Sequence, residues 1–172
     1  QLQILGLNSC WVGGSFKKVK EAYSVEQDEE LKCVISFGYG ATQGKPHPQK
    51  KTLDDIAVNK SIAASFPDWF VHGVEAALLA PTAVNQQKFA FVLHDNNQVE
   101  AQAKFSLIGY SHLDLGIAKY HFEIGAGKEN FSWVQVLFAI RDITLHKGFV
   151  PLWRFCFHIS YTVRDEAICF AH

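Results

Sequence analysis

The order of hydrophobic and polar positions predicts helices and strands in turn along this chain. Apolar residues recur at helical spacing between Pro67 and Pro81, which predicts an amphipathic helix that Pro67 opens and Pro81 stops. Apolar runs at 31–37 and 89–94 have strand character, and the second run is closed by the Asp-Asn-Asn turn at 95–97. The pattern therefore predicts a mixed α+β order.

Capping residues predict further helices. Residues 15–24 form a short polar stretch with helical character, and Thr52 followed by Asp55 has the spacing of a capping box. Ser111 can cap another helix, which we expect to end near Gly127.

Both ends of the chain depart from this pattern. Residues 1–7 look like the end of an apolar helix, and because the chain contains no methionine, we expect an upstream part of the protein to be missing. The Gly- and Pro-rich stretch at 38–51 predicts a loop between two structured halves. Residues 135–172 are rich in Phe, Trp and Ile without core-helix periodicity. We therefore expect one domain at 1–134 and a tail at 135–172.

Composition narrows the class of protein. A hydrophobic content of 48% with 19% charged residues is typical of a globular domain, and a net charge of -1 gives no field that would attract nucleic acid or an anionic membrane. No apolar run has the length that crosses a bilayer, and no secretory signal is visible. We expect a cytoplasmic protein whose partner is a small molecule.

Motifs for metal and nucleotide chemistry are absent from the sequence. The cysteines lack the close pairs of zinc or redox motifs, and we expect reduced, mostly buried thiols at Cys10, Cys33, Cys156 and Cys169. No metal site is predicted, because acidic or Cys residues do not follow a ligand spacing around His47, His72, His112 and His121. There is no GxSxG, P-loop or GxGxxG motif.

Five segments occur in the order seen in nitroreductases, namely GLNSCWVGG (6–14), SFGYG (36–40), PQKKTLDD (48–55), AALLAPTAVNQQKF (76–89) and LDLGIAKYHFE (113–123). Over about residues 1–134 the chain resembles these FMN-dependent enzymes, most closely the branch in which two related halves share one chain. The resemblance implies an α+β fold with a central antiparallel sheet flanked by helices. It also implies that FMN lies, without a covalent bond, between two subunits of a homodimer or two halves of a pseudo-dimer.

The resemblance also implies where the cofactor binds. The backbone at Val12, Gly13 and Gly14 would lie near flavin N5, and paired glycines allow such a close approach. The pyrimidine side of the flavin would contact Pro81, Thr82, Asn85 and Gln87, whose carboxamides can both donate and accept. Basic residues for the phosphate would be Lys50 and Lys51, since the family's Arg-Ser-x-Arg motif has no counterpart here.

Each of these groups has a simpler interpretation. The double glycine can be an ordinary turn between helices, Thr82 and Asn85 can merely close the step from helix to strand, and Lys50 and Lys51 can lie on a solvated loop.

The function implied by the resemblance is hydride transfer from NAD(P)H through FMN to a nitroaromatic, quinone or similar small acceptor. No catalytic side chain is predicted, because the cofactor carries the chemistry. The alternative is a non-catalytic protein, either flavin-binding or a structural remnant.

Overall fold

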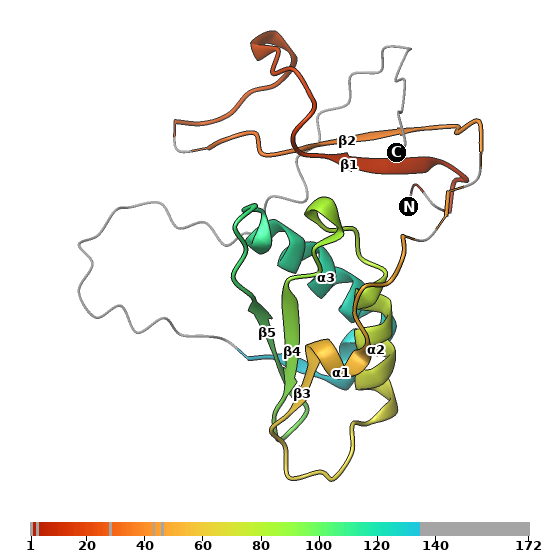
Figure 1. The fold of residues 1–172 in the computed structure, drawn as a ribbon, viewed down its shortest axis with the longest axis vertical. Coiled ribbons are helices and arrows are strands. Elements are labelled where there is room, and N and C mark those ends of the chain that lie inside the picture. The colour runs from red at the N-terminus through yellow and green to blue at the C-terminus, as the bar shows by residue number, and fades with distance from the viewer. Residues whose placement is uncertain (1, 3, 28, 43, 46, 135–172) are drawn as a thin grey trace. The chain divides into compact units, whose positions relative to one another are not determined.

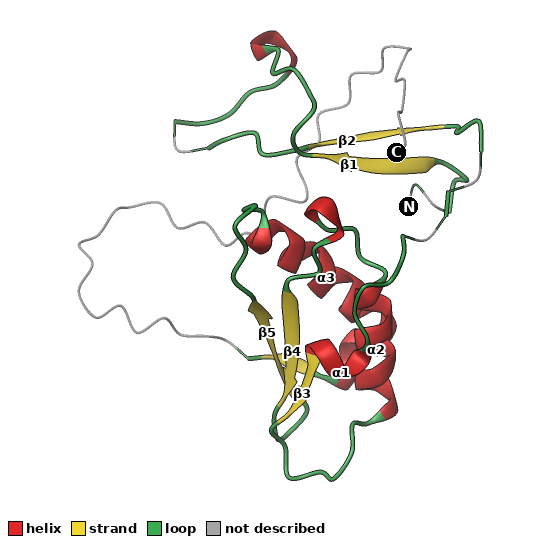
Figure 2. Cartoon of the chain, viewed as in Figure 1, coloured by secondary structure: helices red, strands yellow, loops and turns green. Residues whose placement is uncertain are grey.

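The computed structural model describes residues 2, 4–27, 29–42, 44–45 and 47–134 (Figure 1). This part of the chain forms two compact units, the first up to residue 45 and the second from residue 47 onward. Strands occur in both units and α-helices in the second, so the mixed α+β fold is confirmed (Figure 2).

The first unit is built on one antiparallel strand pair. Strand β1 (Asn8–Val12) pairs with β2 (Val34–Gly38), with Asn8 opposite Gly38 and Val12 opposite Val34. Strand β2 confirms the strand predicted at 31–37. A 3-10 turn, η1 (Lys20–Ala22), lies in the long connection between the two strands.

Three predictions for the first unit are wrong. The helix expected at 15–24 is reduced to η1, because a short polar stretch has no apolar face to pack and an isolated short helix is marginal in water. Residues 4–6 form a turn with Gly6 at φ 73°, not the end of a helix. Cys10 is exposed and Cys33 half-buried, so these two thiols are not in a core. The tail at 135–172, with Cys156 and Cys169, lies outside the described residues.

The second unit is a four-stranded sheet with helices packed on it. In chain order its elements are α1 (Leu53–Ile56), β3 (Ala57–Asn59), α2 (Asp68–Leu78), η2 (Ala83–Asn85), β4 (Phe89–Leu93), β5 (Gln98–Ala103), α3 (Ser111–Ala126), η3 (Lys128–Asn130) and β6 (Ser132–Trp133). The strand order is β3-β4-β5-β6.

The predicted antiparallel order holds only for the central pair of this sheet. Strands β4 and β5 form an antiparallel hairpin across the turn at 95–97, whereas β3 runs parallel to β4 and β6 runs parallel to β5. The physical reason is the connection, because α2 joins β3 to β4 and α3 joins β5 to β6. A crossover through a helix brings the next strand back in the same direction.

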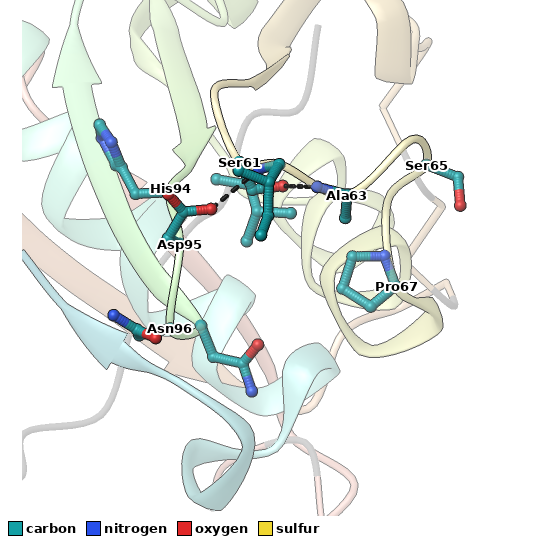
Figure 3. Close-up of a pocket in the computed structure, with 10 residues that line it drawn as sticks. Ser61, Ala63, Ser65, Pro67, His94, Asp95 and Asn96 are labelled. Carbon is teal, nitrogen blue, oxygen red and sulfur yellow. Dashed lines mark hydrogen bonds between the residues drawn. The ribbon is translucent and has the colours of Figure 1, made fainter.

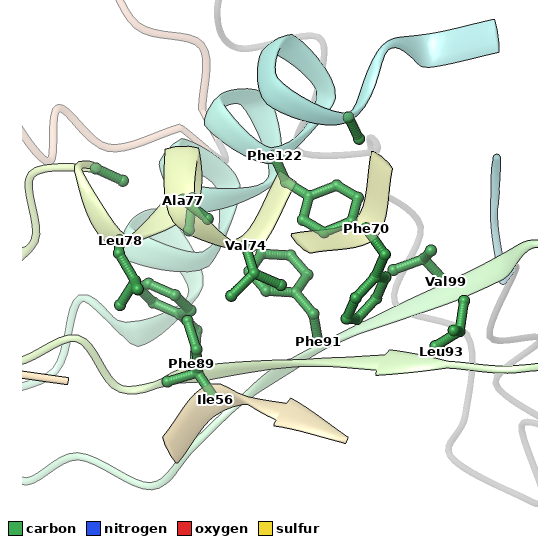
Figure 4. Packing of buried hydrophobic residues seen from close by; sticks show 13 residues of the cluster. Ile56, Phe70, Val74, Ala77, Leu78, Phe89, Phe91, Leu93, Val99 and Phe122 are labelled. Carbon is green, nitrogen blue, oxygen red and sulfur yellow. The ribbon is translucent and has the colours of Figure 1, made fainter. Parts of the chain in front are cut away.

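The core lies between this sheet and helices α2 and α3 (Figure 4). All five residues of β4 are buried, as the continuous apolar run FAFVL predicts for a strand covered on both faces. Phe91 of β4 stacks on Phe122 of α3 at 4.6 Å between ring centroids, and Phe70 of α2 meets the same ring edge-on at 5.6 Å. Aromatic rings therefore join both helices to the central strand.

Most predicted helix ends are confirmed. Pro67 precedes α2, and Thr52 and Asp55 form the predicted capping box. Gly127 ends α3 with φ 74°, but Ser111 does not cap that helix, and this prediction is wrong. Tyr110 holds the cap position in a left-handed conformation with φ 61°, so the chain enters α3 through a sharp turn of its backbone.

Helices α2 and α3 cross at two glycines. A Cβ added at Gly73 would lie 2.8 Å from ring carbons of Phe122, and one at Gly125 would press on the carbonyl oxygen of His72 and lie 2.5 Å from the Ala76 side chain. Both distances are shorter than van der Waals contact allows. The close approach of the two helices therefore requires the absence of side chains at these positions.

The crossing predicts opposite effects for two alanine substitutions in α3. Gly125→Ala should lower the free energy of unfolding by about 1–3 kcal/mol, because the new methyl group overpacks the crossing. Gly116→Ala meets nothing within 4 Å and should stabilise by about 0.5–1 kcal/mol through helix propensity. Urea unfolding measures both. Equal stabilisation by the two substitutions would contradict the close crossing.

Candidate functional site

The turn between α2 and β4, residues 82–87, has an unusual backbone. Val84, Asn85 and Gln87 have φ values of 46°, 52° and 45°, in the left-handed region that non-glycine residues rarely adopt. For a β-branched residue such as Val84 this conformation is strongly disfavoured. Strain of this kind persists only where surrounding contacts hold it, and it clusters at functional sites. We refer to this segment as the 82–87 turn.

Gln87 is one of the contacts that hold the turn. Its side chain is 1% exposed, its Nε2 donates to the Leu78 carbonyl (3.0 Å), and its Oε1 accepts from the Lys50 backbone N–H (3.2 Å). The Gln87 backbone N–H donates to Thr82 Oγ1 at 3.1 Å. The Gln87 carboxamide thus joins the end of α2 to the loop that carries Lys50 and Lys51, which we call the basic loop. Thr82 closes the turn, the role given to it by the simpler interpretation.

Asp114 holds the turn from the other side. This carboxylate is 2% exposed, and it accepts from the Ala83 backbone N–H (2.9 Å) and from Gln86 Nε2 (2.6 Å). Gln86 also donates to the Gly109 carbonyl and accepts from the Ser106 hydroxyl. The first turn of α3 and the loop before it are therefore fastened to the 82–87 turn.

Neither Asp114 nor Gln86 was among the predicted site residues. A carboxylate in the first turn of a helix ordinarily interacts with its own helix end, which conceals a longer-range role. One signal was present in the sequence. Asp114 shares the four-residue spacing of the buried face of α3 with Ala118, Phe122 and Ala126, and a charged residue on a buried face must find partners.

Asn85 is the least satisfied polar residue of the turn. Its Nδ2 donates to the Pro48 carbonyl at 2.9 Å, which brings the turn against the segment before the basic loop. Its Oδ1 is buried and has no hydrogen-bond partner among the described residues. A buried acceptor left unpaired costs about 1–3 kcal/mol, and a ligand or an ordered water can remove that cost.

The predicted phosphate residues lie beside the turn. The backbone of Lys50 is bonded to Gln87, its side chain is exposed, and Lys51 is half-buried. Lys51 also acts on Asp55, whose carboxyl pKa is lowered mainly by the backbone N–H of Thr52 and by its hydroxyl, with a smaller effect from the Lys51 charge. The Lys51 ammonium thus has an acidic neighbour, whereas the positive charge of Lys50 extends toward solvent.

The double glycine belongs to the first unit. Val12 is half-buried at the end of β1, and Gly13 and Gly14 form the bend that follows the strand, so the segment is not a turn between helices. A Cβ at Gly14 would meet nothing within 4 Å. Packing within the described residues therefore does not require glycine at position 14.

Bonds between the basic loop and the 82–87 turn link Lys50 to Gln87 and Pro48 to Asn85, and Thr82 bonds to Gln87 within the turn. Lys51 is the next residue along the loop. Pro81 directly precedes this turn and is half-buried. Val12, Gly13 and Gly14 form a second group in the other unit.

A hollow of about 370 Å³ lies elsewhere in the second unit, between the loop at 61–67 and the turn at 94–97 (Figure 3). Its lining shares no residue with the predicted site. Asp95 bridges its two walls by accepting from the Ile62 backbone N–H at 2.8 Å, and His94 is already paired with Glu100 at 3.0 Å. The Asp95 carboxylate and the His94 ring are thus already engaged in bonds within the fold.

Metal-ligand clusters and membrane-spanning helices are both absent from the described residues. No group of three His, Cys, Asp or Glu side chains among them could hold a metal ion. None of the helices in the same residues is long and apolar enough to span a membrane.

Comparison with known proteins identifies the class of protein to which this α+β chain belongs. A family model described as "Putative TM nitroreductase" matches residues 1–126, and the chain belongs to this family. The resemblance drawn from the five segments is therefore confirmed.

A solved structure supports the fold independently. The chain is similar to the crystal structure of a putative nitroreductase from Thermotoga maritima MSB8, with 23% identity and a TM-score of 0.52. The similarity covers 74% of this chain and 49% of that one, so the chain spans about half the length of this structural relative. At this identity the likeness concerns the fold alone. Comparison with curated proteins yields no significant match.

The bonds to Asp114 predict a large stability effect. Asp114→Ala leaves the Ala83 N–H and the Gln86 amide without their acceptor, and it should lower the free energy of unfolding by about 2 kcal/mol or more. The matched control is Asp68→Ala in the first turn of α2, where an exposed carboxylate contributes only about 0.3–1 kcal/mol. Urea unfolding compares the two variants. A loss at Asp114 no larger than that at Asp68 would show that the turn does not depend on this carboxylate.

Proposed function

We propose that this chain holds FMN without a covalent bond and serves an NAD(P)H-dependent oxidoreductase of the nitroreductase type. The observation that carries the proposal is the buried, unpartnered Oδ1 of Asn85 in the strained turn of the family motif. A fold does not by itself define a function, which depends on the residues of its site.

The chemistry of Asn85 fits one edge of a flavin. The pyrimidine ring of a flavin presents an N–H donor at N3 between two carbonyl oxygens, and Asn85 offers an unpaired acceptor for that donor. Pro81 directly precedes this turn and Thr82 begins it, and both would lie along this edge. Gln87 would act mainly by holding the turn, because its carboxamide is bonded to Leu78 and Lys50.

The remaining predicted residues would hold the other parts of FMN. The backbone at Val12, Gly13 and Gly14 would approach the ring near N5, and the ammonium groups of Lys50 and Lys51 would neutralise the phosphate. FMN, when bound, supplies the hydride and electron transfer from NAD(P)H to a nitroaromatic, quinone or similar acceptor. The protein's own task is to bind, orient and enclose, so no side chain is assigned as an acid or base.

Assembly and location belong to the same proposal. We propose that the FMN site is completed by a second copy of the chain or by the other half of a longer chain, since this chain spans about half of its structural relative. A small-molecule acceptor is the expected partner, and the net charge of -1 gives no reason to expect nucleic acid or a membrane surface. We propose that this reaction takes place in the cytoplasm, with NAD(P)H as its electron donor.

Two substitutions test the proposed binding residues. Gly13→Val should abolish FMN binding, because its side chain enters the space that the ring needs, and Asn85→Ala should weaken binding about fivefold through the loss of one polar contact. Calorimetric titration of the chain with FMN measures both effects. Circular dichroism confirms that each variant remains folded.

Matched controls separate these effects from backbone changes. Gly44→Val places the same side chain at an open position of the first unit, and Asn96→Ala removes an asparagine with φ 56°, close to the 52° of Asn85. Neither control should alter FMN affinity. If Gly13→Val and Asn85→Ala both retain full FMN affinity and full NADPH oxidation with a quinone acceptor, the assigned segments are only turns. FMN binding without NADPH oxidation would instead identify the chain as a non-catalytic flavin-binding protein.

A further inference from the structure

Lysines from three distant parts of the sequence meet at one end of the sheet in the second unit. Strand β3 runs parallel to β4 and β5 runs antiparallel to it, so the starts of β3 and β4 and the end of β5 lie at the same end. Lys51 lies just before α1, which leads into β3. Lys88 directly precedes β4, and Lys104 directly follows β5. The topology of the sheet therefore collects positive charge at this end.

Lys88 and Lys104 lie directly opposite one another. Phe89 pairs with Ala103, and the Lys104 backbone N–H donates to the Lys88 carbonyl at 2.8 Å, so the register of the hairpin continues by one more pair. Opposite residues of an antiparallel pair point to the same face of the sheet, with Cβ atoms about 4.5–5.5 Å apart. Two like charges in this arrangement repel each other, and a bound anion would relieve that repulsion.

The Lys104 side chain is held in place by α1. Its Nζ donates to the Asp55 carbonyl at 3.0 Å. The pKa of the Asp55 carboxyl is lowered mainly by hydrogen bonds from Thr52 and, to a smaller extent, by the charges of Lys51 and Lys104. Both ammonium groups therefore lie near the same carboxylate. One carboxylate does not neutralise Lys51, Lys88 and Lys104 together, so an excess of positive charge remains.

We propose that Lys88 and Lys104 join Lys51 in a site for a phosphate monoester, and that its ligand is the terminal phosphate of FMN. This inference rests on the proposed FMN function and adds two binding residues to those named for it. A phosphate monoester carries a charge of about −1.5 to −2 at neutral pH, and its oxygens accept from several ammonium groups at once.

The lysine site is continuous with the candidate site for the ring. Lys88 directly follows Gln87, whose carboxamide accepts from the Lys50 backbone N–H. The 82–87 turn, which carries Asn85, thus ends at the lysines. A ligand with a ring at the turn and a phosphate at its other end would engage both. Free phosphate has the same charged group, and competition between the two ligands distinguishes these sources.

The test compares FMN with riboflavin, which has the same ring but lacks the phosphate. In calorimetric titrations the full chain should bind FMN at least about tenfold more tightly than riboflavin, because riboflavin makes no charge-assisted contacts with the lysines. Lys88→Gln and Lys104→Gln should each weaken FMN binding about fivefold and change the affinity for riboflavin by less than about twofold. Added salt should weaken FMN binding and leave riboflavin binding unchanged.

Matched variants serve as controls. Lys104→Arg keeps the positive charge and should retain most of the FMN affinity. Lys60→Gln makes the same chemical change at an exposed lysine near the opposite end of β4, where its backbone N–H donates to the Leu93 carbonyl at 2.8 Å. This variant should bind both flavins as the wild-type chain does. Inorganic phosphate should compete with FMN and not with riboflavin.

The outcomes distinguish this inference from the proposed function. Equal wild-type affinities for FMN and riboflavin would overturn the phosphate site and leave the proposed flavin function standing. An equal loss of affinity for both flavins in Lys104→Gln would overturn it as well, by showing that this lysine serves the fold. Phosphate that binds at the lysines without displacing FMN would show that they hold a different anion, against the proposal. If the wild-type chain binds neither flavin, the proposed function itself fails, and the inference fails with it.

Discussion

The described structure of the second unit depends on one constraint, which is that the strained 82–87 turn must be held by buried polar side chains. Asp114 and Gln87 provide most of the hydrogen bonds that keep the turn in place. Both side chains are almost fully buried, and both bond to backbone groups at distant points of the chain. Without them, the left-handed residues of the turn would lack the contacts that keep such strain in place. The strain is therefore explained by the network around the turn.

The apolar core places these two side chains where they act. Gly73 and Gly125 let α2 and α3 approach closely, and the contacts of the Phe122 ring with Phe91 and Phe70 link both helices to β4. The end of α2 and the beginning of α3 are then brought to the same turn, which leads directly into β4. Packing and polar bonds thus both position the turn. Within the described part of the chain, the buried side-chain atoms left unsatisfied belong to Asn85 and His47.

Local sequence patterns predicted the helices and strands that are determined by residues near one another in the chain. Helix α2, strand β4 and the Thr52 capping box follow from periodicity, a continuous apolar run and a four-residue motif. Strand β5 was missed because Val99 is its one fully buried residue and its polar positions give no apolar run. Strand β3, three residues long, is formed by pairing with β4 and has no signal of its own.

In the candidate site, too, the features with a local sequence pattern were predicted and the long-range contacts were not. The resemblance located Asn85, Gln87 and the basic loop in sequence, but it did not show that Gln87 is fully engaged inside the fold. The convergence of His47 and Asn85 on Pro48 links positions nearly forty residues apart, and only the folded chain brings them together. Long-range bonds of this kind leave no local pattern for sequence reasoning to detect.

The most direct test of the central claim is to follow the backbone amide signals of the ¹⁵N-labelled chain by NMR as FMN is added. Our account predicts that the largest shift changes fall on residues 12–14, 47–51 and 82–87. Changes confined to the hollow at 61–67 and 94–97, or no changes at all, would contradict it.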